Sequence, residues 1–249
     1  MPNLARLLAI AVALVSAPPA WARPVYKVGS TSTGVPFTFL EVKSNTIQGA
    51  MVDLVKAIGD DAGFDVAVEA TPFSALIPSL TSNKIDIISA AMLITEARKQ
   101  VVDFSDPVFP YPEGMIVKSD DDTPYHSLAD IKGATVGAQA GTVYVDFLKK
   151  EGQFAEVKVY DSLADVMRDV ALGRIKAGFG DGPILAYQVS QNPGFKVKLV
   201  KSYQPKMAGS VGIAVRKGDA DMLKKINASL AKLKASGTLD KILAKWNLK

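Results

Sequence analysis

The chain of 249 residues contains no cysteine and a single histidine, His126. The absence of cysteine excludes disulfide bonds, zinc–thiolate sites, thiol nucleophiles and a lipid anchor attached to cysteine. His126 follows a polar stretch, residues 119–125, that indicates a loop. A lone loop histidine supports neither a Ser-His-Asp triad nor a metal site. We therefore expect no metal, no cofactor and no hydrolase of that kind.

Long apolar runs are also missing. A membrane-spanning helix needs about 20 apolar residues, and the longest run, residues 7–17, is shorter. This run follows Arg6 and precedes Ala20-Trp21-Ala22. A cation, an apolar segment and a small-residue cleavage site together indicate a secretory signal peptide, residues 1–22. The mature protein is expected to be soluble and periplasmic.

Charge is sparse and close to balanced. Charged residues make up 22% of the chain, apolar residues 48%, and the formal net charge is +4. Such a composition predicts a chain that buries a full core. The lysines near the C-terminus are spaced like the exposed face of amphipathic helices, and no aromatic platform accompanies them. We therefore expect no nucleic-acid partner.

Short apolar strands alternate with longer amphipathic helices from residue 25 onward, which is typical of an α/β fold. This alternation of strands and helices occurs in two successive units, and a further strand and two helices follow the second unit. The pattern predicts strands at 26–29, 64–68, 85–88, 135–137, 157–159, 175–179 and 210–215, and helices at 51–63, 74–80, 143–150, 163–172, 223–233 and 238–246.

Two segments of these units resemble each other. Leu80–Ile85 and Val170–Ile175 each end a helix, turn through a residue suited to positive φ, and start a strand with a cation followed by Ile. The repeat predicts two similar lobes.

The segment 85–108 carries the strongest functional signal. A strand leads through small residues to a helix start at Thr95-Glu96, with Arg98 in the first turn. A cation there opposes the helix dipole, which favours anions. The arrangement predicts an anionic ligand group held by backbone N–H groups and the arginine fork. The alternative is an ordinary surface arginine.

Several landmarks occur in a fixed order along the chain. They are Ile47–Leu54, Ala75–Leu80, Lys84–Asp86, Ile94–Arg98, Phe104–Pro107, Gly173–Ile175, Asp181 and Ser236–Thr238. Together they resemble the family 3 periplasmic solute-binding proteins, the polar amino-acid receptors of ABC importers. The resemblance implies the two-lobed type II periplasmic binding protein fold, with a sheet flanked by helices in each lobe. It implies two hinge strands, with lobe 1 at residues 23–112 and 208–249 and lobe 2 at 113–207.

The resemblance also implies roles at both faces of the cleft. Arg98 would clamp the ligand's α-carboxylate, aided by the N–H of Leu93, and the N–H groups of Thr142 and Val143 would reach the same carboxylate. Asp181 would pair with the α-ammonium group. Its alternative role is that of a turn residue beside Gly180 and Gly182.

Five further residues would line the pocket. Phe73 would contact the ligand side chain or be a core residue, and Phe37 is a weaker candidate of the same kind. Ala91 stands where relatives carry a serine, while Gln139 would add a polar contact. Thr31 stands where receptors for basic amino acids carry an aspartate, so a cationic ligand is disfavoured. The expected ligand is a small zwitterion, most simply a neutral or polar amino acid.

The sequence thus predicts the substrate-binding component of an ABC importer, monomeric and not an enzyme, with an inner-membrane permease as its partner. A second hypothesis is an enzyme on the same scaffold, similar to cyclohexadienyl dehydratases. Its general acid would be Asp181 or Glu113, although Glu113 is interpreted as a surface residue near the hinge. A third hypothesis is a soluble sensor for a membrane receptor.

Overall fold

The computed structural model describes residues 22–248. The predicted signal peptide therefore lies outside the described residues, except for Ala22. Among residues 22–248, no helix has the length and apolar character that crossing a membrane requires.

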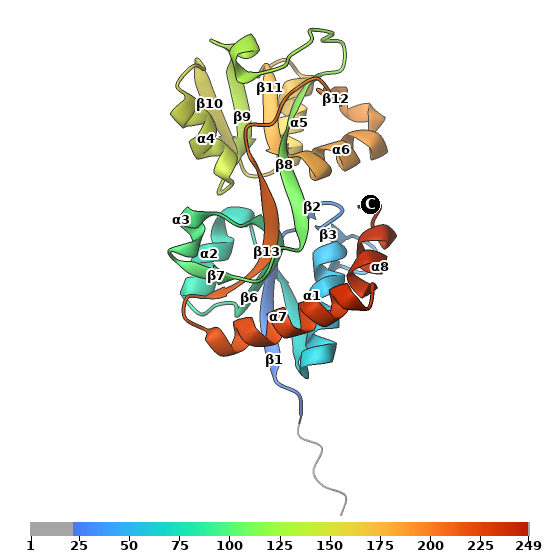
Figure 1. Cartoon of the computed structure of the whole chain (residues 1–249). Coiled ribbons are helices and arrows are strands. Elements are labelled where there is room, and N and C mark those ends of the chain that lie inside the picture. Colours follow the sequence, from blue (N-terminus) through green and yellow to red (C-terminus); the bar gives the residue numbers. More distant parts are fainter. Residues whose placement is uncertain (1–21, 249) are drawn as a thin grey trace, which may run out of the picture.

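Two lobes lie one above the other, joined by the long strands β8 (Phe109–Lys118) and β13 (Ala208–Arg216) (Figure 1). Lobe 1 contains β1 (Val25–Ser30), β2 (Thr33–Gly34), β3 (Thr38–Glu41), β4 (Thr46–Gln48), α1 (Ala50–Ala62), β5 (Asp65–Ala70), η1 (Phe73–Ala75), α2 (Leu76–Thr81), β6 (Ile87–Leu93), α3 (Glu96–Lys99), β7 (Val102–Phe104), α7 (Ala220–Ala235) and α8 (Thr238–Lys245). Lobe 2 contains η2 (Leu128–Ile131), β9 (Thr135–Gln139), α4 (Val143–Glu151), β10 (Glu156–Tyr160), α5 (Leu163–Ala171), β11 (Ala177–Asp181), α6 (Gly182–Gln191), η3 (Pro193–Phe195) and β12 (Val197–Leu199).

One hydrogen-bonded sheet runs through both lobes in the order β10-β9-β11-β8-β13-β6-β1-β5. The pairs β1–β5, β1–β6, β9–β10 and β9–β11 are parallel. Parallel pairs need crossover connections, which here carry helices that cover the sheet. Strands β8 and β13 pair antiparallel, with Phe109 opposite Val211. They hold the lobes together, and the predicted α/β fold of two lobes is confirmed.

Helix α1 shows how the local sequence determines an element. Its buried residues include Met51, Leu54 and Ile58, which follow helical spacing. It ends at Gly63, whose φ of 79° is a conformation that glycine adopts without strain. The two turns of the internal repeat also contain a residue with positive φ, since Asn83 has φ 60° and Gly173 has φ 69°.

Strand β6 differs from the prediction. It runs from Ile87 to Leu93 and is buried throughout, whereas the sequence predicted a strand that ends at residue 88. The small residues between these points belong to the strand, and Ala91 adopts φ 50° where the register with β13 shifts. A bulge of this kind re-aims the end of a strand. Helix α6 and strand β12 were also absent from the prediction.

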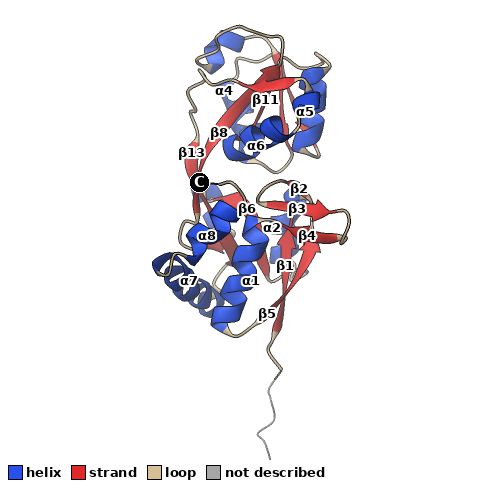
Figure 2. Ribbon diagram, turned by 90° about the vertical axis from the view of Figure 1, so that its right-hand side faces the viewer, coloured by secondary structure: helices blue, strands red, loops and turns tan. Residues whose placement is uncertain are grey.

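Helices α1, α7 and α8 pack against one another on lobe 1 (Figure 2). Helix α7 buries Ile226 and Leu230, while Lys224 and Lys232 remain exposed. The lysines of α7 thus form the solvated face that their spacing predicts. The core cluster that contains Ile226 and Leu230 also contains Tyr111 of β8 and Leu185 of lobe 2.

Candidate functional site in the cleft between the lobes

Arg98 is held at the end of β6 by its own short helix. The Thr95 hydroxyl caps α3 by accepting a hydrogen bond from the Arg98 backbone N–H at 3.2 Å. The guanidinium donates to the Leu93 carbonyl at 2.8 Å and, across the cleft, to the Gly141 carbonyl of lobe 2 at 3.0 Å. Arg98 is only 9% exposed. It is therefore no ordinary surface arginine.

The helix-dipole explanation for Arg98 is wrong. Helix α3 has four residues, and a single turn aligns too few peptide groups to give a substantial macrodipole. Two backbone carbonyls hold the guanidinium instead. Because an arginine carries five N–H donors, these two bonds leave others for an anionic ligand group.

Asp181 ends β11 and precedes α6, opposite Glu113 of β8 in the sheet register. One of its carboxylate oxygens accepts a hydrogen bond from the Tyr144 hydroxyl at 2.7 Å. Burial raises the pKa of Asp181 to about 6, although the Tyr144 hydrogen bond and the positive charge of Arg98 oppose the rise. The Asp181 carboxylate is thus ionised at neutral pH but sensitive to mild acid.

The two charges influence each other. Burial lowers the pKa of Arg98, and the Asp181 carboxylate counteracts this effect. A cation from lobe 1 and an anion from lobe 2 therefore share one cleft. An α-amino acid carries a carboxylate and an ammonium group on a single carbon, so this pair of charges matches its charged end.

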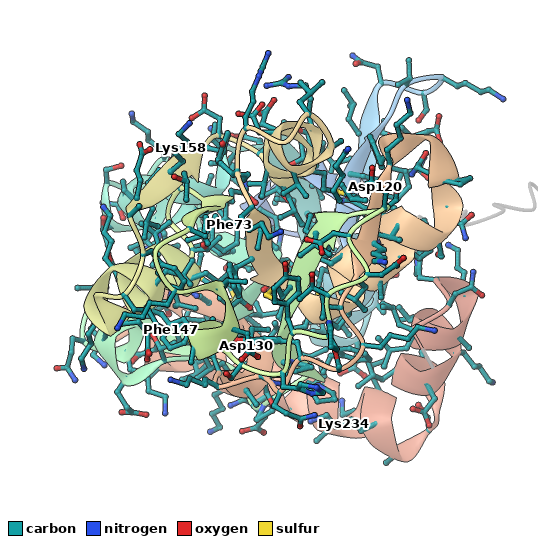
Figure 3. All side chains as sticks on the ribbon, turned by 90° about the horizontal axis from the view of Figure 1, so that it is seen from above. Phe73, Asp120, Asp130, Phe147, Lys158 and Lys234 are labelled. Carbon is teal, nitrogen blue, oxygen red and sulfur yellow. The ribbon has the colours of Figure 1, made fainter. Side chains whose placement is uncertain are left out.

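Three other predicted residues of lobe 1 lie near Arg98. Its guanidinium stacks over the Phe73 ring, 5.6 Å from the ring centroid. Seen from above, Phe73 lies near the middle of the molecule and Lys234 at its edge (Figure 3). Leu93 supplies the carbonyl that Arg98 binds, and Ala91 lies two residues earlier on the same buried strand.

Thr31 and Phe37 are also buried. The Thr31 hydroxyl pairs with that of Thr38 at 2.6 Å. Phe37 is 1% exposed and packs edge-on against Phe109 and Tyr111, with ring centroids 5.5 and 5.2 Å away. The structure therefore places Phe37 in the core.

The lobe 2 residues form the entrance to α4. Thr142 is its N-cap residue, and both its hydroxyl and its backbone N–H donate to the Gln139 carbonyl, at 2.7 and 3.3 Å. The Gln139 amide donates within its own lobe to the Asp161 carbonyl at 3.1 Å. Val143 is the first residue of α4 and is partly buried.

Three functional candidates were missed or misjudged from sequence. Tyr111 and Tyr144 are each 1% exposed and resemble ordinary core aromatics in the sequence. The interpretation of Glu113 as a surface residue is wrong, because it is 2% exposed. Its carboxylate accepts hydrogen bonds from the Tyr203 hydroxyl and from the Lys206 N–H, the latter at 2.8 Å. The signal for Tyr111 is its position between Pro110 and Pro112, which marks an unusual strand.

The lobes touch directly at the cleft. Besides the bond from Arg98 to Gly141, the Gln188 amide of α6 donates to the Thr33 carbonyl of lobe 1 at 3.3 Å. Gly141, with φ 75°, approaches so closely that a Cβ there would lie 2.6 Å from the Ser74 Cα. The structure is therefore that of lobes in contact.

Surface hollows also lie away from Arg98 and Asp181. One of about 400 Å³ is lined by α6 and C-terminal residues, including Pro183, Tyr187 and Leu248. Within residues 22–248, no cluster of three or more His, Asp or Glu side chains could hold a metal ion.

Comparison with known proteins agrees with this fold and cleft. Residues 26–249 match the model of the bacterial extracellular solute-binding proteins, family 3, and the chain belongs to this family. The arginine-binding periplasmic protein of Mannheimia haemolytica is 36% identical over 85% of this chain and 86% of its own.

Two solved structures of an ancestral arginine-binding protein are also similar. The one bound to arginine is 38% identical, with a TM-score of 0.81 over 90% of this chain and 98% of that chain. The one bound to glutamine is 37% identical, with a TM-score of 0.84 over 91% and 99%. The family predicted from the ordered landmarks is confirmed, and with it the solute-binding function.

Proposed function

We propose that this protein binds a neutral or polar α-amino acid between its lobes and delivers it in the periplasm to an inner-membrane ABC permease. The observation that carries the proposal is that the charges of Arg98 from lobe 1 and Asp181 from lobe 2 act on each other in the cleft. Arg98 holds the α-carboxylate, and Asp181 holds the α-ammonium group. Because each charge comes from a different lobe, only closed lobes engage both ends of the ligand.

Strand geometry supports a role for the Leu93 N–H. The Ile94 N–H bonds to the Ser210 carbonyl of β13. Successive residues of a strand point their backbone groups to opposite sides, so the Leu93 N–H and carbonyl face the other edge. Arg98 binds that carbonyl. The N–H beside it thus lies where a carboxylate held by Arg98 would accept it.

The neutral ligand is supported by Thr31, whose uncharged hydroxyl is already paired with Thr38. Relatives named for arginine do not contradict this choice, since an ancestral arginine-binding protein has also been solved with glutamine. We also propose lobe limits of 23–112 with 208–249, and 113–207, which the two crossing strands support. We propose a monomer, secreted by residues 1–22, whose closed form docks on the permease.

The direct test is a thermal-shift screen of ligand-stripped protein against the standard L-amino acids, with organic acids and polyamines as comparison classes. A ligand at 100 times its Kd should stabilise the protein by about 2.7 kcal/mol. Hits among neutral amino acids are expected. Hits confined to polyamines or organic acids would contradict the pairing of Arg98 with Asp181.

We further propose that the ligand leaves unchanged. Asp181 receives a hydrogen bond from Tyr144 and faces a cation, which suits holding an ammonium group rather than transferring a proton. Incubation with prephenate and arogenate, the substrates of the enzyme hypothesis, should leave both intact. Turnover that disappears in Asp181→Asn would establish an enzyme instead.

A further inference from the structure

A buried phenol in the cleft has no hydrogen-bond partner. Tyr111 of β8 is 1% exposed, and its hydroxyl bonds to nothing among residues 22–248. Its ring is fixed edge-on against Phe37, with centroids 5.2 Å apart. An unpaired buried hydroxyl costs free energy, and such a group in a native structure calls for an explanation. A ligand group that forms a hydrogen bond with this hydroxyl would explain it.

The surroundings of Tyr111 define what that partner is. Burial raises the pKa of the Tyr111 phenol well above its usual value, and the Asp181 carboxylate and the Tyr144 phenol raise it further. The phenol is therefore neutral and lies in the negative potential of Asp181. A group bound there is attracted if it is a cation and repelled if it is an anion.

Tyr144 supplies a second oxygen. It lies in the first turn of α4, is 1% exposed, and donates its only hydroxyl proton to Asp181 at 2.7 Å. A phenol oxygen whose proton is used still has lone pairs that accept hydrogen bonds. Burial and Asp181 raise the Tyr144 pKa well above its usual value, so this donor stays protonated.

We propose that the hydroxyl oxygens of Tyr111 and Tyr144 join the Asp181 carboxylate in a three-oxygen site for a primary ammonium group. An unsubstituted ammonium has three N–H donors, one for each oxygen. Because Arg98 acts on Asp181 in the same cleft, the ammonium is the one next to the ligand's carboxylate. The site deepens the proposed function, on which it rests, by assigning primary-amine zwitterions as the substrate class. N-methylated amino acids and α-hydroxy acids are excluded.

Tyr111→Phe tests the site by deleting the unpaired hydroxyl alone. Because no residue from 22 to 248 bonds to this hydroxyl, the variant measured without ligand should melt at the same temperature as wild type or higher. Its affinity for the strongest-binding standard L-amino acid should fall about 10- to 100-fold, the usual effect of a hydrogen bond to a charged group. The preference for that amino acid over its N,N-dimethyl derivative should fall by a similar factor.

Tyr125→Phe is the matched control. Tyr125 of lobe 2 is 3% exposed, and its hydroxyl donates to Asp121 at 2.9 Å. Neither residue belongs to the proposed site. This variant should melt lower and bind as wild type does, the opposite pattern to Tyr111→Phe. Tyr144→Phe should weaken binding and move the pH midpoint of binding upward, because it removes a hydrogen bond that lowers the Asp181 pKa.

Three results would overturn the proposal. Wild-type affinity in Tyr111→Phe removes Tyr111 from the site but leaves the proposed function standing. Equal binding of the amino acid and its N,N-dimethyl derivative by wild-type protein would also contradict the three-oxygen site. The proposed function would still stand. Failure of every standard L-amino acid to bind wild-type protein overturns the proposed function, and the ammonium site falls with it.

Discussion

The two lobes face the same cleft with different chemistry. Lobe 1 presents a guanidinium held by backbone carbonyls and stacked on Phe73. Lobe 2 presents a carboxylate whose pKa is raised to about 6, bonded to a phenol. Arginine keeps its charge throughout the working pH range, whereas Asp181 does not. Arg98 is thus charged throughout the working pH range, whereas Asp181 loses its charge in mild acid.

The lobes also differ in how they use that charge. Arg98 already reaches across the cleft to the Gly141 carbonyl, so it joins the lobes in addition to the ligand-binding role that we propose for it. Asp181 accepts its hydrogen bond from Tyr144, within lobe 2. Substitutions on the two sides should therefore affect binding differently.

Arg98→Ala should have the largest effect. It removes the carboxylate partner and the bond across the cleft, and should weaken binding by about 2–5 kcal/mol because it leaves a buried anion unpaired. Arg98→Lys keeps the charge without the fork and should bind with intermediate affinity. Arg168→Ala, on the exposed face of α5, is the control that should bind normally. Isothermal titration calorimetry measures all three, and normal binding by Arg98→Ala would contradict the carboxylate clamp.

Asp181→Asn comes next. A hydrogen bond between charged groups contributes about 1.5–3 kcal/mol, so zwitterions should lose roughly this much affinity. Ligands without an amino group should be affected much less. Competition titrations with an amino acid and its deaminated analogue measure the difference. Equal losses for both would remove Asp181 from the ammonium role.

Mild acid should weaken ligand binding by protonating Asp181 of lobe 2. As the pH falls below about 6, Asp181 takes up a proton and affinity for a zwitterion should drop, by at most about tenfold per pH unit. Titrations from pH 7.5 to 4.5 on wild type and Asp181→Asn check this, since the variant should lose most of the dependence. An unchanged profile in the variant would place the titrating group elsewhere.

The same shift affects stability with the opposite sign. The pKa of Asp181 is raised in the folded, ligand-free protein relative to the usual 3.8, so folding favours the protonated carboxyl. Its stabilising contribution is complete below pH 3.8 and is lost as the pH rises through about 6. Asp181→Asn should therefore melt higher than wild type at pH 7.5, with a smaller gain at pH 4. Chemical denaturation at both values tests this.

The sequence predicted the charged residues on both sides of the cleft, Arg98 and Asp181, but neither Tyr111 nor Tyr144. Arg98 follows a buried strand and a Thr cap, and both signals are local. The contribution of Tyr111 arises only when β8 pairs with β13 and closes against lobe 2, which no local pattern encodes. Tyr144 is buried in α4 as an ordinary core residue would be. What distinguishes it is one hydrogen bond to a residue 37 positions away.

Fold prediction succeeded where periodicity and turn chemistry agree, as in α1 and its Gly63 end. It was incomplete at β6, because Ser89, Ala90 and Ala91 have low strand propensity and tertiary pairing keeps them extended. The error about the helix dipole at Arg98 has a related cause. The sequence showed where α3 begins but not that it ends after one turn.

The smallest expected effect concerns an uncharged hydrogen bond between the closed lobes. Gln188→Ala removes the amide that binds the Thr33 carbonyl at 3.3 Å and touches neither half of the charged pair. A neutral hydrogen bond contributes about 0.5–1.5 kcal/mol, so affinity should fall roughly two- to tenfold for all ligands alike. Gln191→Ala, exposed on the same helix, should have no effect. Because the closed form is the one that retains ligand, the loss should appear as faster dissociation in stopped-flow measurements. A loss that depends on the ligand's amino group would mean instead that α6 contributes to the Asp181 half of the site.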